Sequence, residues 1–154
     1  MTSSPFKRWR QSGAAAVELA LLLPIFVFLM SFPLFLGRYF WHYTAAQKAT
    51  QDAARYLSTI SEREMRDPAL AEAAAALAND IVQKEIAELN TGGLRPRVAV
   101  LCGDVPCQGV TTSPLPETVT VNARMDMADH IFGLDFGRYG VQLNVRYEVR
   151  YVGK

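Results

Sequence analysis

The sequence has few of the side chains that catalysis and metal binding require. Only two histidines and two cysteines occur among its 154 residues, and it contains neither a phosphate-cradling glycine-rich loop nor a Gly-x-Ser-x-Gly elbow. The histidines, His42 and His130, lie far apart in dissimilar segments, so they form no metal-ligand pattern with the cysteines. We therefore expect no enzymatic activity, no metal, no cofactor and no small-molecule substrate.

Charge is also scarce, and it is nearly balanced. The formal net charge is +1, whereas binding to a nucleic-acid backbone needs a concentrated basic face, so nucleic acid is not expected as a partner. The local distribution is more informative, because Lys7, Arg8 and Arg10 precede an apolar stretch and no acid occurs before Glu18. By the positive-inside rule, the N-terminus is predicted to stay in the cytoplasm and the chain after the apolar stretch to be exported.

Residues 14–37 are predicted to form a membrane anchor. Apart from Glu18, they contain no ionisable side chain before Arg38, and a helix of this length spans a hydrocarbon core of about 30 Å. Tyr39, Trp41 and Tyr43 follow at once and suit the far membrane interface. The apolar run is too long for a cleaved secretory signal, and no small-x-small pattern follows it. We therefore predict a retained single-pass helix.

Two prolines lie inside this predicted helix. Pro24 and Pro33 each remove one backbone donor, so the helix is predicted to bend at the turns before them. Membrane helices tolerate such residues more readily than soluble helices do.

Residues 38–66 are predicted to extend the anchor as an amphipathic helix. Apolar residues recur there at alternating steps of three and four, at Ala46, Ala49, Ala53, Tyr56 and Ile60. Small side chains allow close approach of helices, so this face is interpreted either as part of the core of the chain's own domain or as a packing face for neighbouring subunits. The pattern also leaves open whether residues 58–66 form a hinge or a kinked continuation.

Residues 67–154 are predicted to fold as an exported α+β domain. Asp67-Pro68 combines an N-cap residue with proline at the first helical position, which predicts a helix from Asp67 to Leu89. Apolar and polar residues then alternate, which indicates about three strands, at residues 97–101, 118–125 and 141–152. An antiparallel sheet with one wet face is expected, and the 67–89 helix is the predicted cover for the other face.

Two loops of this domain carry distinctive residues. Cys102 and Cys107 are expected to form a disulfide because the domain is exported, with two free thiols as the alternative. A ring this short removes little chain entropy, so its stabilisation should be modest. The linker before the last strand contains apolar residues that either fill the core or form an exposed contact: Ile131, Phe132, Leu134 and Phe136.

Glu18 is the most informative residue in the chain. A lone carboxylate costs roughly 2.5–3.5 kcal/mol at the centre of a membrane helix on insertion scales, and somewhat less near the boundary. An acid that is retained at such a cost is expected to have a partner. The other interpretation is that its side chain only reaches back to the cytoplasmic interface.

The residues around Glu18 resemble a known N-terminus. The run Gln-Ser-Gly-Ala-Ala-Ala-Val-Glu-Leu-Ala-Leu-Leu-Leu-Pro, residues 11–24, is similar to the start of the TadE family, pseudopilins of the tight-adherence (Flp-type IV) pilus machinery. Residues 37–40 and 46–56 resemble the stretch that follows in that family, and the similarity extends over about residues 11–58. The chain length suits TadE or TadF better than the longer TadG-like relatives.

The resemblance implies a pilin-like fold and an assembly function. Residues 1–13 would be a basic leader that a prepilin peptidase removes after Gly13, with Ala14 as the new N-terminus. The new ammonium group could then pair with Glu18, within the helix or in the adjoining subunit, so that neither charge is buried alone. The implied location is the bacterial inner membrane, and the implied partners are this peptidase, other pilins or pseudopilins, inner-membrane pilus assembly proteins and membrane lipid.

Two alternatives remain at this stage. One is an unprocessed single-pass envelope protein with an extracytoplasmic binding domain, and the other is a minor pseudopilin of a type II secretion system. Whether the subunit enters the filament, primes it or stays in the membrane complex is not decided by the sequence.

Overall fold

The structure is a computed structural model that describes residues 12–89, 95–107, 114–127, 130–131, 134–135 and 141–153. The chain divides into two compact units, Met1–Arg38 and Tyr39–Lys154, and each is described by itself. The second unit includes both the amphipathic segment and the sheet domain that the sequence pattern treats separately. The leader cations Lys7, Arg8 and Arg10 lie outside the described residues.

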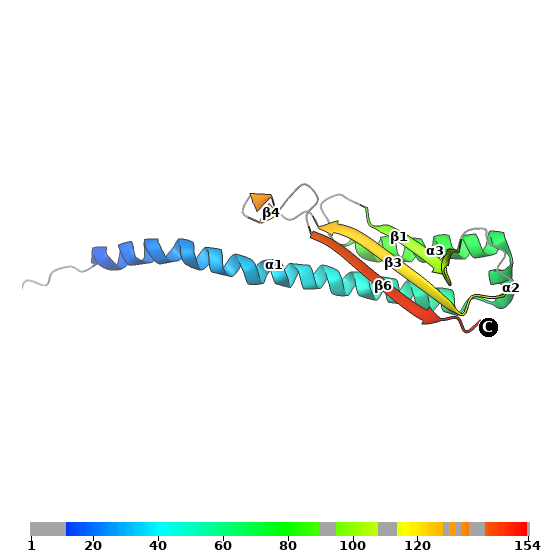
Figure 1. The fold of residues 1–154 in the computed structure, drawn as a ribbon. Coiled ribbons are helices and arrows are strands. Elements are labelled where there is room, and N and C mark those ends of the chain that lie inside the picture. Colours follow the sequence, from blue (N-terminus) through cyan, green and yellow to red (C-terminus); the bar gives the residue numbers. More distant parts are fainter. Residues whose placement is uncertain are drawn as a thin grey trace, which may run out of the picture. The chain divides into compact units, whose positions relative to one another are not determined.

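The N-terminal segment is helical from its first described residue. Helix α1 runs from Ser12 to Ser58 and contains Pro24 and Pro33 in its interior (Figure 1). Its Gly13–Ser58 portion is the one helix in the described part of the chain that is long and apolar enough to cross a membrane. The most apolar window of that portion has none of its residues buried, as expected for a helix whose apolar surface is covered by lipid or by another helix. The predicted bends at the two prolines remain predictions.

A short break ends α1 and settles the question of residues 58–66. Helix α2, Glu62–Arg66, begins with a capping box in which the Ser61 hydroxyl accepts from the Glu64 N–H and the Glu64 carboxylate accepts from the Ser61 N–H. Helix α3, Pro68–Ala87, follows directly, and the Asp67 carboxylate caps it by accepting from the Ala69 N–H at 3.0 Å. These residues form two helices with separate caps, which excludes the kinked continuation.

The C-terminal part forms an antiparallel sheet with the order β2-β1-β3-β6. Its strands are β1 (Arg97–Cys102), β2 (Val105–Pro106), β3 (Thr118–Met127) and β6 (Val141–Arg150). The three predicted strands are confirmed with shifted ends, and β2 is a fourth strand that the pattern did not indicate because it has only two residues. A separate hairpin pairs β4 (His130–Ile131) with β5 (Leu134–Asp135). Phe132 and Phe136 lie outside the described residues, and so do the side chains of Ile131 and Leu134.

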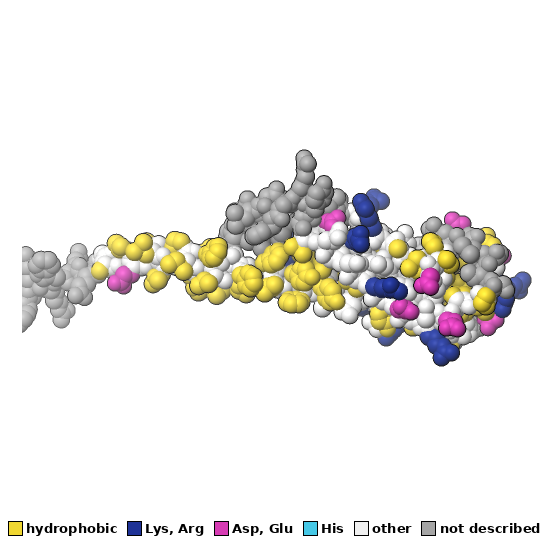
Figure 2. Space-filling view, viewed as in Figure 1, with side chains coloured by type: hydrophobic (Ala, Val, Ile, Leu, Met, Phe, Trp, Pro, Cys, Tyr) yellow, Lys and Arg dark blue, Asp and Glu magenta, His cyan; other side chains and the backbone are white. Residues whose placement is uncertain are grey.

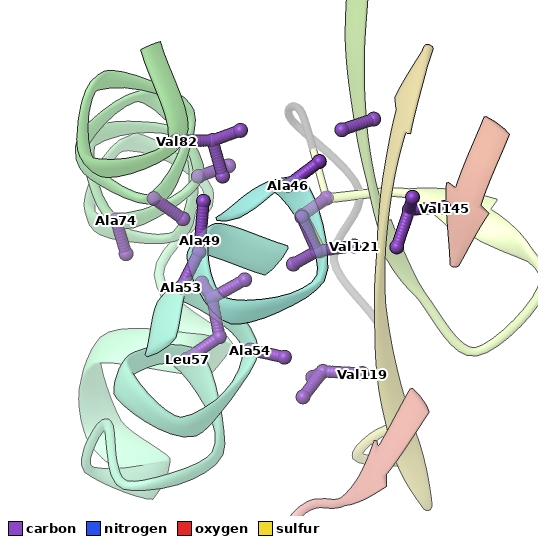
Figure 3. Close-up of a cluster of buried hydrophobic side chains, with 14 of the residues drawn as sticks. Ala46, Ala49, Ala53, Ala54, Leu57, Ala74, Val82, Val119, Val121 and Val145 are labelled. Atoms are coloured by element: carbon purple, nitrogen blue, oxygen red, sulfur yellow. The ribbon is translucent and has the colours of Figure 1, made fainter. Parts of the chain in front are cut away.

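The core lies where the C-terminal part of α1 meets α3 and the sheet. Figure 3 shows Ala46, Ala49 and Ala53 of α1 between Val82 of α3 and Val121 of β3. The prediction that the 67–89 helix is the cover of the sheet was therefore incomplete, since α1 lies against the sheet as well. Helix α3 contacts the sheet near the start of β1. There the Gln83 side-chain amide donates a hydrogen bond of 2.7 Å to the carbonyl of Pro96, the residue before the strand.

The buried face of α3 consists mostly of small side chains. Leu70 and Leu77 are 44% and 46% exposed, whereas the buried positions are mostly alanines: Ala71, Ala74, Ala75, Ala78, Val82 and Ile86. The face of α1 toward α3 is also built from alanines. Two helices can approach closely only where their facing side chains are small, so the alanine face packs inward and the leucines remain outside.

Candidate assembly site

Gly13, Ala14 and Glu18 lie in the first two turns of α1, and all three are exposed. Ala14 and Glu18 are four residues apart, so they share one face of the helix. At a rise of 1.5 Å per residue, their Cα atoms are about 6 Å apart along the axis. A charged group on the nitrogen of Ala14 would therefore lie within reach of the Glu18 carboxylate.

The surroundings of Glu18 are apolar. Figure 2 shows hydrophobic side chains along the N-terminal part of α1, and Val17, Leu19, Leu21 and Leu22 are all more than 60% exposed. In the described part of α1, Glu18 is the only ionisable side chain before Arg38. A carboxylate among such side chains loses its hydration as soon as lipid or a neighbouring helix covers them.

Gly13 has no structural role that the fold explains. A Cβ atom added at this position would meet nothing within 4 Å, and the residue lies in an ordinary helix. Its presence is therefore not explained by packing or by backbone conformation in the described part of the chain.

The alanine stripe, defined as Ala46, Ala49, Ala53 and Tyr56, is occupied by contacts within the chain. The three alanines have no exposed surface and Tyr56 is half-buried. Lys48 and Arg55, which point away from this stripe, are exposed. A neighbouring subunit that packs beside this part of α1 would thus meet the polar faces and not the stripe.

The disulfide joins Cys102 and Cys107, and both residues are buried. The bridge closes the turn between β1 and β2, where the Cys107 N–H also donates to the Val100 carbonyl at 3.2 Å. The sulfur of Met65 from α2 lies 3.8 Å from the Cys102 sulfur. The bridge therefore links the β1–β2 turn to the helical layer through a buried sulfur contact.

Residues 151–153 pack against the C-terminal end of α1 and hydrogen-bond to it. The sequence did not reveal this contact. The Tyr151 hydroxyl donates to the Ile60 carbonyl at 2.8 Å, and the Val152 N–H donates to the Ser58 carbonyl at 3.1 Å. These bonds satisfy carbonyls that a helix end leaves without partners. Gly153 completes the contact with φ of +51°, and a Cβ there would lie 3.0 Å from the Glu62 side chain. No local signal marks these residues, because their partners are about ninety positions earlier in the chain.

Tyr151 is expected to make this contact sensitive to alkaline pH. Burial raises the pKa of Tyr151 above its ordinary value near 10, and Glu62 and Glu64 raise it further, while Arg66 opposes them. Because the folded-state pKa lies above the unfolded value, the stabilisation is complete below about pH 10 and is lost as pH rises through the folded pKa. Tyr151→Phe should lower the free energy of unfolding by about 0.5–1.5 kcal/mol at neutral pH and reduce its decline above pH 10.

Denaturant unfolding of the full chain in detergent, at several pH values between 8 and 11, measures both effects. Tyr147→Phe is a matched control, since the Tyr147 hydroxyl has only a long 3.5 Å contact with the Gln51 amide. An identical pH profile for the wild type and Tyr151→Phe would contradict the assignment.

No group of three or more histidine, cysteine or acidic side chains that could hold a metal ion occurs among the described residues. A long apolar N-terminal helix, further helices and an antiparallel sheet packed against them define the class as an α+β pilin-like protein. The family model described as TadE-like protein matches residues 13–55, so the chain carries a TadE-like domain in its N-terminal third. No curated protein and no solved structure matches the chain.

The matched segment contains Gly13, Ala14 and Glu18 at its start and the three alanines of the stripe near its end, while Tyr56 lies one residue beyond it. The sheet and α3 lie outside it. Members of the TadE-like pilin family are typically non-enzymatic structural proteins. The family resemblance inferred from residues 11–58 is confirmed over the matched residues.

Proposed function

We propose that this protein is a TadE-like minor pseudopilin, a subunit that serves the assembly of a tight-adherence (Flp-type IV) pilus. It is anchored in the bacterial inner membrane by the N-terminal half of α1, with its N-terminus in the cytoplasm and its α+β domain outside. Before assembly, a prepilin peptidase removes residues 1–13. The observation that carries the proposal is the exposed Glu18 one helical turn from Ala14, in the part of α1 before Arg38, which is apolar, has no other charged side chain and matches the TadE-like model.

The positive charge that cleavage would create on the nitrogen of Ala14 supports cleavage between Gly13 and Ala14. Before cleavage, the nitrogen of Ala14 is a neutral peptide group and offers the Glu18 carboxylate no opposite charge. After cleavage it is an ammonium group on the same helical face, about one turn away. Pairing within one helix, or between the helices of adjoining subunits, then offsets the desolvation of both charges. An intersubunit pair would also set the stagger between neighbouring helices.

Gly13 supports the same proposal from the side of the peptidase. Because nothing in the described structure requires a glycine there, recognition by another protein is a reason for its retention. The absence of a side chain leaves the backbone on the N-terminal side of the cleaved bond unhindered. The exposed, apolar first turns of α1 are also the part of the chain that a membrane-embedded peptidase would meet.

Intact-mass measurement tests the proposal directly. The protein is produced with and without the cognate prepilin peptidase, and the full chain is purified from membranes in each case. With the peptidase, the expected product begins at Ala14, and without it the product retains residues 1–13. Gly13→Leu should remain uncleaved in the presence of the peptidase, while Ser12→Ala, one residue away, should be processed. Wild-type chain recovered with its leader from cells that contain the active peptidase would contradict the proposal.

A further inference from the structure

A hollow lies on the second unit, between the C-terminal half of α1 and the end of α3. It is lined by Trp41, Ala45 and Lys48 of α1 and by Glu85, Glu88 and Leu89 at the end of α3. Its volume is about 430 Å³, which is within the range of roughly 300–1,000 Å³ that small-molecule sites occupy. None of these residues belongs to the assembly site or to the alanine stripe.

The charged residues of the hollow are not used by the fold. In the part of the chain that the structure describes, Lys48, Glu85 and Glu88 form no ion pair within 4.0 Å, whereas the neighbouring Lys84 pairs with Asp80 at 2.7 Å. One cationic and two anionic side chains therefore line the same hollow and are open to a ligand that carries both signs of charge. Glu85 is half-buried, so its carboxylate has already lost part of its hydration.

Trp41 contributes an exposed aromatic side chain to the hollow, and it follows soon after the apolar run in the sequence. Its side chain is 70% exposed, which is unusual for so large an apolar group unless it meets another apolar or cationic partner. It follows Leu36, near the end of the apolar run, by five residues in the sequence. Tryptophan is enriched where hydrocarbon gives way to lipid headgroups, just beyond such a run. The Lys48 side chain, two turns further on, is long enough to reach back toward the same layer.

From this combination we propose that the hollow binds the headgroup of a zwitterionic phospholipid from the outer leaflet of the membrane that α1 crosses. The ammonium group lies against the Glu85 and Glu88 carboxylates and the face of Trp41, a cation–π contact. The phosphate group accepts from the Lys48 ammonium. The two carboxylates disfavour an anionic headgroup, because it would bring a phosphate close to both without a compensating cation. The proposal rests on the membrane anchor and is independent of cleavage and of the pilus function.

Native mass spectrometry of the full-length chain in detergent tests the proposal. The probes are phosphatidylethanolamine, phosphatidylcholine and phosphatidylglycerol with identical acyl chains. The chain should retain one molecule of phosphatidylethanolamine or phosphatidylcholine, each at least about tenfold more tightly than phosphatidylglycerol. The double substitution Glu85→Gln and Glu88→Gln should reduce this preference to within about twofold. Lys48→Gln should weaken retention of all three lipids.

Glu72→Gln is the matched control, because Glu72 is an exposed acid on α3 outside the hollow. It should leave the lipid preference unchanged. Glu88→Gln alone, at an exposed position, should still weaken phosphatidylethanolamine retention about threefold, so a folding defect in the double variant does not remove the test.

Trp41 fluorescence supplies a second measurement. The sequence has two tryptophans, Trp9 and Trp41, so Trp9→Phe makes Trp41 the sole tryptophan whether or not the leader is removed. In vesicles that contain a choline lipid with a nitroxide on its headgroup, Trp41 should be quenched more strongly in this background than when Glu85→Gln and Glu88→Gln are added.

Three results would overturn the proposal. They are equal retention of phosphatidylglycerol, an unchanged lipid preference in the double variant, and a lipid-free dimer in which a second copy of the chain covers the hollow.

Discussion

Glu18→Ala and Glu18→Gln are expected to insert into the membrane and to be cleaved, yet to reduce pilus production by about a hundredfold or more. If the proposed cleavage after Gly13 creates an ammonium group on Ala14, removal of the carboxylate leaves that group without a partner when neighbouring helices exclude water. Breaking a buried ion pair by removing one member costs roughly 3–5 kcal/mol, and each 1.4 kcal/mol is about a factor of ten in an equilibrium. The measurement is the quantity of sheared pili from cells in which the variant replaces the wild-type gene.

Two controls separate the loss of charge from the loss of packing. Leu19→Ala truncates the adjacent exposed side chain and should leave pilus levels close to those of the wild type. Glu18→Asp keeps the charge on a shorter side chain and should retain an intermediate level. Wild-type pilus levels with Glu18→Gln, in cells where the chain is membrane-inserted and processed, would remove the assembly role from this carboxylate.

Ala53→Leu is expected to destabilise the second unit by about 1–3 kcal/mol, because it adds three carbon atoms where no space exists. Ala53 has no exposed surface, and it packs where α1 meets α3 and the sheet (Figure 3). The neighbouring side chains can admit a leucine only by leaving their preferred rotamers or by moving the helix axis. Thermal or denaturant unfolding of the full chain in detergent measures the loss.

Gln47→Leu is the matched control for this substitution. Gln47 is exposed on the same helix, so an added leucine there meets solvent and should change the unfolding free energy by less than about 0.5 kcal/mol. If the stripe were instead a packing face for neighbouring subunits, Ala53→Leu would leave the isolated chain as stable as the wild type and would impair only assembly. The two interpretations of the stripe thus predict opposite results for the purified monomer.

The candidate assembly site could be proposed from the sequence, because the cost of placing a charge in a membrane helix depends only on the residues that are adjacent in the chain. Whether a carboxylate is costly depends on the length and polarity of the run that contains it, and Glu18 between Arg10 and Arg38 meets that criterion directly. The strands were also recognisable, since a sheet with one covered face must alternate apolar and polar residues, as β6 does. The start of α3 was predicted from Asp67 and Pro68 because both act through the backbone next to them.

Other features depend on segments that are distant in the chain. The alternation in β6 indicates that one face is covered but does not say by which helix, and the structure shows that the C-terminal half of α1 lies there. Leu70 and Leu77 are the larger apolar residues of α3, but the closeness of α1 and α3 made alanines the inner face and left both leucines exposed. The hydrogen bond from Tyr151 to Ile60 and the hollow beside Trp41 likewise join residues that are far apart in sequence.

The amino-acid sequence alone indicated the apolar helix that suits a membrane anchor, the positions of Gly13 and Glu18, the start of α3 and the three longer strands, because each depends on short-range periodicity, capping or transfer into lipid. Only the tertiary structure decided which helix faces the sheet, which side of α3 is buried and which charges line the hollow. Those outcomes depend on how closely elements approach one another, and that distance is set by side chains on both partners at once.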